Sequence, residues 1–196
     1  MSKTVEFFFD LGSPASYLAW TQLPALCARL DAQLVYRPML LGGVFQATGN
    51  ASPVMVPAKA RHVFVDMQRY ARRYGVTLAF PPGFPINTLN LMRGTVAVQQ
   101  FAPQRFEAYL TCVFQALWVQ QRNLGDLAEL ASVLQAAGFD AEQFQAWTAD
   151  PEVKAALKAA TDEAVQRGVF GAPTCFVGEQ MFFGQDRLDF VAEALG

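Results

Sequence analysis

The architecture of this chain follows from its opening segment, Val5-Glu6-Phe7-Phe8-Phe9-Asp10-Leu11-Gly12-Ser13-Pro14-Ala15-Ser16-Tyr17-Leu18. Residues 5–9 form a short, almost wholly apolar run, which is typical of a strand buried on both faces. Ser13 before Pro14 predicts a helix start, because a serine hydroxyl caps free amides and proline suits the first turn. Leucines then recur at roughly helical spacing, at Leu18, Leu23, Leu26 and Leu30.

A second strand is expected at residues 33–37, ended by Pro38. The first forty residues therefore predict a strand–helix–strand unit with parallel strands and a right-handed crossover. The chain returns to β structure near its end, where residues 174–177 and 180–183 flank Gly178-Glu179. This spacing predicts a β-hairpin, with Asp186 as the cap of a final helix over residues 187–195.

The middle of the chain has a different character. Residues 40–57, rich in Gly, Asn and Pro, are expected to form a loop, and residues 59–74 a helix. A Pro-rich interruption follows at residues 81–85, with Asn87 as a candidate cap. From residue 89 to about residue 167 the pattern is helical, with breaks near Pro103, Asn123, Gly138 and Pro151.

This order predicts an α/β protein with a thioredoxin-like fold and a large all-helical insertion. Residues 1–50 and 151–196 would form the thioredoxin-like domain, and residues 51–150 the inserted helical domain.

Composition excludes several classes of protein. The chain has 196 residues, of which 53% are hydrophobic and 16% charged, so it is not a disordered chain. A net charge of −2 argues against a nucleic-acid partner. No apolar run reaches the roughly 18 residues that span a bilayer. Residues 1–6 lack the features of a signal peptide, so a cytoplasmic location is expected.

The three cysteines, Cys27, Cys112 and Cys175, are isolated and form no C-x-x-C. A disulfide framework or a dithiol redox centre is therefore not expected. The chain contains one histidine, His62, and no Cys/His spacing that suits a metal. We accordingly expect no metal site.

Three local signals meet at one edge of the predicted sheet. Ser13 stands at a helix N-terminus, where exposed amides and the helix dipole favour an anion. Ala172-Pro173 precedes the third strand and is a candidate cis peptide. Residues 184–187 begin the last helix. Each signal alone is weak, since Ser and Asp at helix starts are usually only caps.

Together, the segments at residues 9–19, 169–174 and 183–188 resemble 2-hydroxychromene-2-carboxylate isomerases. That family is related to kappa-class glutathione transferases and to the DsbA-type thioredoxin fold. The resemblance covers nearly the whole chain. It implies that the chain binds glutathione and uses serine in place of a reactive cysteine.

The resemblance also implies roles for individual residues. Ser13 would be the catalytic residue and would donate a hydrogen bond to the glutathione sulfur, favouring the thiolate. Asn50 and Lys59 match the family pattern Asn…Pro…Pro-x-Lys. Lys59 would pair with a carboxylate of the tripeptide, and Asn50 would supply a donor and an acceptor.

The other end of the glutathione site would lie on two turns. Ala172 would bind the cysteinyl part through its backbone, although most relatives have a larger aliphatic residue there. Asp186 would accept from the γ-glutamyl ammonium. Backbone amides from Gln185 to Arg187 would hold the γ-glutamyl carboxylate. Trp20, Phe45, Phe84 and Trp118 are expected mostly in the core, and they are also the candidates for an aromatic substrate pocket.

The resemblance favours a glutathione-dependent cis–trans isomerase that acts on a small aromatic electrophile, working as a homodimer. Two alternatives remain. The segment at residues 41–59 resembles kappa-class transferases at least as much, which would form a stable glutathione conjugate. A non-catalytic thiol or peptide binder on the same scaffold is also compatible. A dithiol oxidoreductase is disfavoured, because Ser13 and Ser16 occupy the reactive positions.

Overall fold

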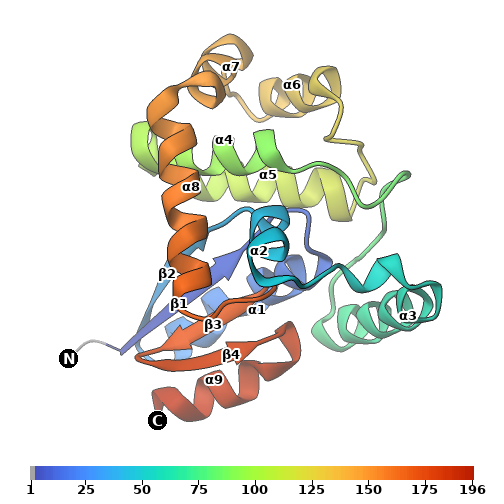
Figure 1. Ribbon diagram of the computed structural model, residues 1–196, viewed down its shortest axis with the longest axis vertical. Coiled ribbons are helices and arrows are strands. Elements are labelled where there is room, and N and C mark those ends of the chain that lie inside the picture. The colour runs from blue at the N-terminus through green and yellow to red at the C-terminus, as the bar shows by residue number, and fades with distance from the viewer. Residues whose placement is uncertain (1–2) are drawn as a thin grey trace.

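A computed structural model of the chain describes residues 3–196 (Figure 1). Met1 and Ser2, part of the N-terminal segment considered above, lie outside the described residues. The α/β class and the thioredoxin-like topology are confirmed. A four-stranded sheet has the order β2-β1-β3-β4. Strands β1 (Lys3–Phe9) and β2 (Ala32–Pro38) are parallel, and β3 (Thr174–Val177) runs antiparallel to both β1 and β4 (Gln180–Phe183).

Both faces of the central strand β1 are covered, as its apolar sequence predicts. Phe7 and Phe9 are fully buried in the larger core cluster, together with residues of α1 (Pro14–Arg29) and α9 (Leu188–Leu195). Phe8 belongs to a second cluster on the opposite face, with Phe176 of β3 and residues near the end of α8 (Pro151–Gln166). Alternation along the strand therefore sends neighbouring phenylalanines into different layers.

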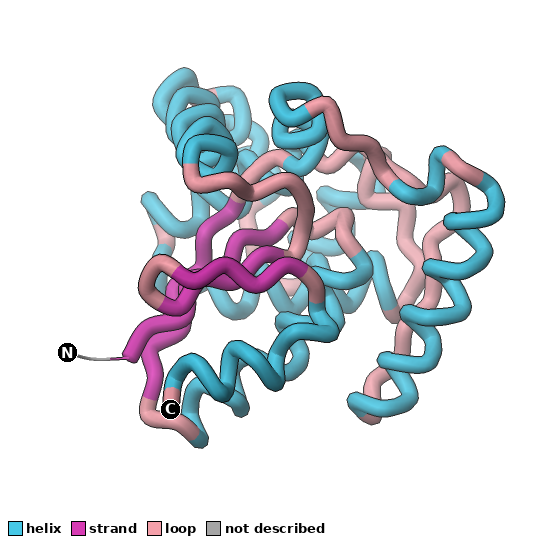
Figure 2. The backbone as a smooth tube through the Cα atoms, turned by 60° about the horizontal axis from the view of Figure 1, so that its bottom comes forward, coloured by secondary structure: helices cyan, strands magenta, loops and turns pink. Residues whose placement is uncertain are grey.

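The helical middle of the chain is confirmed, including its breaks. Its helices are α3 (Pro57–Tyr74), α4 (Leu89–Phe101), α5 (Phe106–Trp118), α6 (Leu127–Ala136) and α7 (Ala141–Ala149). Short 3₁₀ turns lie at Pro53–Met55, Pro103–Arg105 and Gln185–Arg187. Helices α4 to α7 lie together beyond one end of the sheet, and α3 projects to the side (Figures 1 and 2). The division into domains at residues 51 and 150 stays a prediction, since one buried cluster includes residues from both parts.

The expectation of a loop over residues 40–57 was wrong, because this segment contains the helix α2 (Leu41–Thr48). Gly42, Gly43 and Gly49 are poor helix formers, so the local sequence hides this helix. Contacts from distant segments satisfy its first amides. The Leu40 amide donates to the Thr161 hydroxyl at 3.0 Å, and the Leu41 amide donates to the Asp10 carboxylate at 2.8 Å.

Neither predicted cap of the later helices occupies the cap position. Thr88 is the cap residue of α4 and makes no side-chain cap bond, while the Asn87 side chain, one residue earlier, accepts from the Leu89 amide at 2.9 Å. Asp186 as cap of the last helix was wrong. A 3₁₀ turn over Gln185–Arg187 precedes α9, so Arg187 occupies the cap position. The Asp186 carboxylate accepts from the Arg187 guanidinium at 2.7 Å instead.

None of the helices within residues 3–196 combines the length and the apolar character needed to cross a membrane.

An ion pair on the sheet should make stability depend on pH. Both Glu6 oxygens accept from the Arg167 guanidinium, at 2.7 and 3.0 Å, and this bond holds the Glu6 pKa below its ordinary 4.5. A carboxyl group whose pKa is lower in the folded state stabilises the fold while it is ionised, above pH 4.5. This stabilisation is lost as the pH falls through the pKa of the folded state. We therefore expect the advantage of the wild type over Glu6→Gln to shrink below about pH 4.5 in urea titrations. A difference that does not change with pH would contradict this prediction.

Candidate active site

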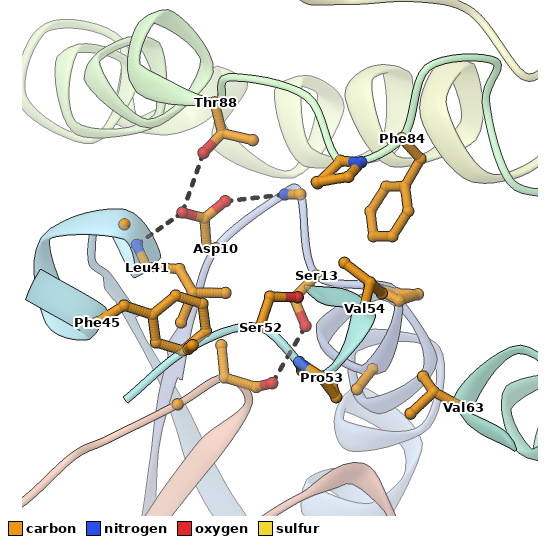
Figure 3. Close-up of a pocket in the computed structure, with 18 of the residues that line it drawn as sticks. Asp10, Ser13, Leu41, Phe45, Ser52, Pro53, Val54, Val63, Phe84 and Thr88 are labelled. Atoms are coloured by element: carbon orange, nitrogen blue, oxygen red, sulfur yellow. Dashed lines mark hydrogen bonds between the residues drawn. The ribbon is translucent and has the colours of Figure 1, made fainter. Parts of the chain in front are cut away.

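A cleft of about 750 Å³ opens where β1 ends. Its walls come from the turn between β1 and α1, the start of α2, one face of α3, the segment before α4, and the turns that contain residues 171–172 and 183–186 (Figure 3). This volume lies within the range of sites that bind small molecules. The cleft therefore brings together the three signals that the sequence placed at one edge of the sheet.

Ser13 lies in the wall of this cleft at the N-terminus of α1. Its hydroxyl accepts from the Ser16 amide at 3.1 Å and donates to the Ala172 carbonyl at 3.1 Å. Pro14 has no amide hydrogen, and the Tyr17 amide donates to the Ser13 carbonyl. In residues 3–196, nothing accepts from the amide of Ala15, which also lines the cleft. The hydroxyl hydrogen of Ser13, this amide and the helix dipole together favour an anion here.

Asp10 also lines the cleft, although it is not among the site residues predicted from the sequence. Its carboxylate is buried and accepts from the Gly12 amide at 2.8 Å, the Leu41 amide at 2.8 Å and the Thr88 hydroxyl at 3.1 Å (Figure 3). Burial raises the Asp10 pKa above its ordinary 3.8, and these three bonds oppose the rise. Asp10 thus joins the starts of α1, α2 and α4. A carboxylate directly after a buried strand and before Gly-Ser-Pro was the available signal.

The turn before β3 contains a cis peptide between Ala172 and Pro173, as predicted. Ala172 lines the cleft and fixes the Ser13 hydroxyl through its carbonyl. Asn50 also lines the cleft, and its amide group donates to the Phe170 carbonyl at 2.8 Å. It therefore ties the segment after α2 to the cis-proline turn. The structure also contains a second cis bond, Phe84-Pro85, in the opposite wall.

The remaining predicted residues divide into two groups. Gln185 and Asp186 line the cleft; the Gln185 side chain is buried, and its oxygen has no hydrogen-bond partner within residues 3–196. Lys59 and Arg187 are exposed and lie outside the cleft wall. The Arg187 amide donates to the Gly184 carbonyl at 3.3 Å, so of the three amides at residues 185–187 this one is already engaged.

Apolar side chains form most of the remaining wall. Figure 3 shows Phe45 on one side of Ser13 and Phe84 on the other, with Val54 and Val63 nearby. Of the four aromatic candidates, Phe45 and Phe84 line the cavity, whereas Trp20 packs against the core cluster. Trp118 is buried in the core, where its ring nitrogen donates to the Leu11 carbonyl at 3.0 Å. The cleft can therefore hold an aromatic ring next to the polar end of α1.

Other reactive groups stand apart from this chemistry. Cys175 is buried in β3, and burial raises the pKa of its thiol to about 12, so it stays neutral at ordinary pH. His62 is exposed on α3. Within residues 3–196 no group of three His, Cys, Asp or Glu side chains is arranged to hold a metal ion.

Comparison with known proteins agrees with this geometry. Residues 4–196 match the model of the DSBA-like thioredoxin domain. The chain is 35% identical to a 2-hydroxychromene-2-carboxylate isomerase of Sphingobium xenophagum, covering 100% of this chain and 99% of that protein. The chain belongs to the 2-hydroxychromene-2-carboxylate isomerase family of DsbA-like thioredoxin domains.

Two further members of this wider group are informative. The solved structure of a 2-hydroxychromene-2-carboxylate isomerase superposes with a TM-score of 0.86 at 32% identity, covering 98% of this chain and 94% of that one. Human glutathione S-transferase kappa 1 is 29% identical, covering 100% of this chain and 92% of the human protein. The family resemblance inferred from the sequence is therefore confirmed over the full chain.

The close packing of the β1–α1 turn leads to a stability prediction. A Cβ atom on Gly12 would lie 2.4 Å from the Thr88 methyl carbon, whereas a Cβ on Gly42 would meet nothing within 4 Å. We expect Gly12→Ala to lower the free energy of unfolding by about 1–3 kcal/mol, because Thr88 must shift away from Asp10. The matched control Gly42→Ala, within α2, should not lower it. Chemical denaturation of both variants is the measurement, and equal stabilities would contradict the prediction.

Proposed function

We propose that the chain is a glutathione-dependent cis–trans isomerase that interconverts 2-hydroxychromene-2-carboxylate and trans-o-hydroxybenzylidenepyruvate, or close aromatic analogues. The observation that supports this most is the Ser13 hydroxyl at the α1 N-terminus, in the wall of a largely apolar cleft. The proposal includes a homodimer in the cytoplasm with no nucleic-acid partner. The net charge of −2 gives no general attraction to nucleic acid.

The cleft offers groups that suit glutathione. The Asp186 carboxylate lines the cleft and can accept from a ligand. The amides of Gln185 and Asp186 can donate to the γ-glutamyl carboxylate. Ser13 and the Ala15 amide would face the sulfur. Lys59 and Arg187 would act from outside the wall as counter-charges for the carboxylates of the tripeptide.

In this mechanism Ser13 holds the sulfur in its anionic form. An ordinary thiol has a pKa of about 8.5, so a hydrogen bond and a helix dipole both increase the thiolate fraction at neutral pH. To donate this bond, the Ser13 hydrogen turns away from the Ala172 carbonyl. When bound, glutathione supplies a nucleophile that adds reversibly to a conjugated double bond, which permits rotation before elimination. Phe45 and Phe84 orient the ring and exclude water.

A kappa-class transferase is the second candidate, supported by the 29% identity to human glutathione S-transferase kappa 1. It would use the same thiolate but release a stable conjugate. Mass analysis of products from glutathione and a panel of aromatic enones separates the two. We expect isomerised substrate and unconsumed glutathione, whereas a stable adduct would favour the transferase. Calorimetry that detects no glutathione binding at millimolar concentration would favour a non-catalytic binder.

A further inference from the structure

A second cleft, of about 520 Å³, lies between α2, α4 and α8. Leu40 and Leu89 line both clefts, so the second one adjoins the candidate active site. Leu157 and Val165 of α8 extend its apolar wall. Nothing in the proposed isomerase reaction uses this space.

The polar groups of the second cleft are mainly basic. Arg93, Lys154 and Lys158 line it, with Asp162 as its one acidic side chain. The Lys158 ammonium pairs with the Asp162 carboxylate at 2.5 Å, which leaves Arg93 and Lys154 without a compensating charge in this wall. This concentration of positive charge occurs in a chain whose net charge is −2.

Arg93 differs from the other half-buried arginines of the described chain. The other four all have acceptors. Arg37 and Arg122 pair with glutamates, Arg105 donates to the Ala137 carbonyl, and Arg167 pairs with Glu6. Arg93, also half-buried, makes no hydrogen bond or ion pair within residues 3–196, and its Nε atom is buried. Because a buried donor without an acceptor is costly, such a group indicates a ligand.

We propose that this cleft is a second binding site, which takes a small organic carboxylate with an apolar body. The planar guanidinium of Arg93 matches a carboxylate through two parallel hydrogen bonds, and Lys154 adds a second positive charge. Leu40, Leu89 and Leu157 receive the apolar body. The site goes beyond the isomerase reaction and does not depend on glutathione.

The test uses benzoate, with benzamide as a neutral probe of the same shape. We expect benzoate to bind by calorimetry and to raise the thermal unfolding midpoint, and benzamide to do neither at the same concentration. Arg93→Gln should weaken benzoate binding by about tenfold or more, since it removes the charged donor pair. Arg72→Gln, which removes an exposed arginine of α3, is the matched control and should bind as the wild type does.

Two further measurements keep the test decisive. Lys154→Gln changes an exposed residue, so it should fold normally and weaken benzoate binding several-fold even if Arg93→Gln does not fold. Benzoate should also bind in the presence of saturating S-hexylglutathione, which would fill the first cleft. Absence of benzoate binding, affinity unchanged in both variants, or full competition by S-hexylglutathione would overturn the proposal. Failure of S-hexylglutathione to bind would count against the proposed isomerase alone.

Discussion

Ser13→Ala should reduce the glutathione-dependent isomerisation rate by about 100-fold or more, the usual effect of removing one hydrogen bond to a reacting anion. The Ser13 hydroxyl is the side-chain donor at the α1 N-terminus, and its present acceptor is the Ala172 carbonyl at 3.1 Å. In the proposed mechanism, loss of this hydroxyl leaves less of the glutathione sulfur ionised near neutral pH. Rates measured against pH should therefore show the thiol ionisation moving to higher pH in the variant.

Ser13 is also a helix cap, so loss of stability has to be separated from loss of chemistry. Its hydroxyl accepts from the Ser16 amide, and losing such a cap costs about 1 kcal/mol. Asp126 caps α6 in the same way, by accepting from the Ala128 amide at 2.8 Å, but lies outside the cleft. Asp126→Ala should lose similar stability and keep its activity. Wild-type kinetics in Ser13→Ala would remove this hydroxyl from the mechanism.

The parts of the fold that were predictable from sequence have strong local signals. An apolar run at residues 5–9, the Ser13-Pro14 pair and the turn at Gly178-Glu179 predicted β1, the start of α1 and the β3–β4 hairpin correctly. These signals are dictated by burial, capping and turn chemistry within a few residues. The same reasoning found the cis bond before β3, because a thioredoxin-like topology sets its place.

Helix α2 was missed because it depends on contacts between distant segments, and two other residues show that local patterns do not fix where a side chain lies. Helix α2 contains two glycines and is held at its start by Thr161 and Asp10, which lie far away in the sequence. Asp186 is of a residue type that commonly caps helices, but it lies in a 3₁₀ turn, where its carboxylate accepts from the Arg187 guanidinium. Lys59 matches a family pattern, although its position on the exposed first turn of α3 leaves it outside the cleft wall. Local patterns identify residue types but do not fix their final partners.

Asp10→Ala should lower the free energy of unfolding by about 3 kcal/mol or more, because buried donors that lose their acceptor each cost about 1–3 kcal/mol. The amides of Gly12 and Leu41 cannot turn toward other acceptors, whereas the Thr88 hydroxyl can. Thr88→Val, which removes only that hydroxyl, should therefore cost much less. Urea denaturation of both variants gives the comparison.

Asp10 should also affect substrate binding through its position in the cleft wall. It connects the starts of α1, α2 and α4, so Asp10→Asn should loosen the cleft and raise KM more than it lowers kcat.

The Asp10 carboxyl should also make the stability of the fold depend on pH. Burial raises the Asp10 pKa above 3.8, so the native state binds this proton more tightly than the unfolded chain does. The stability of the wild type relative to Asp10→Asn should thus fall as the pH rises from about 3.8 through the folded pKa, opposite in sign to Glu6. Parallel profiles for the wild type and Asp10→Asn would show that this carboxylate does not titrate differently in the folded chain.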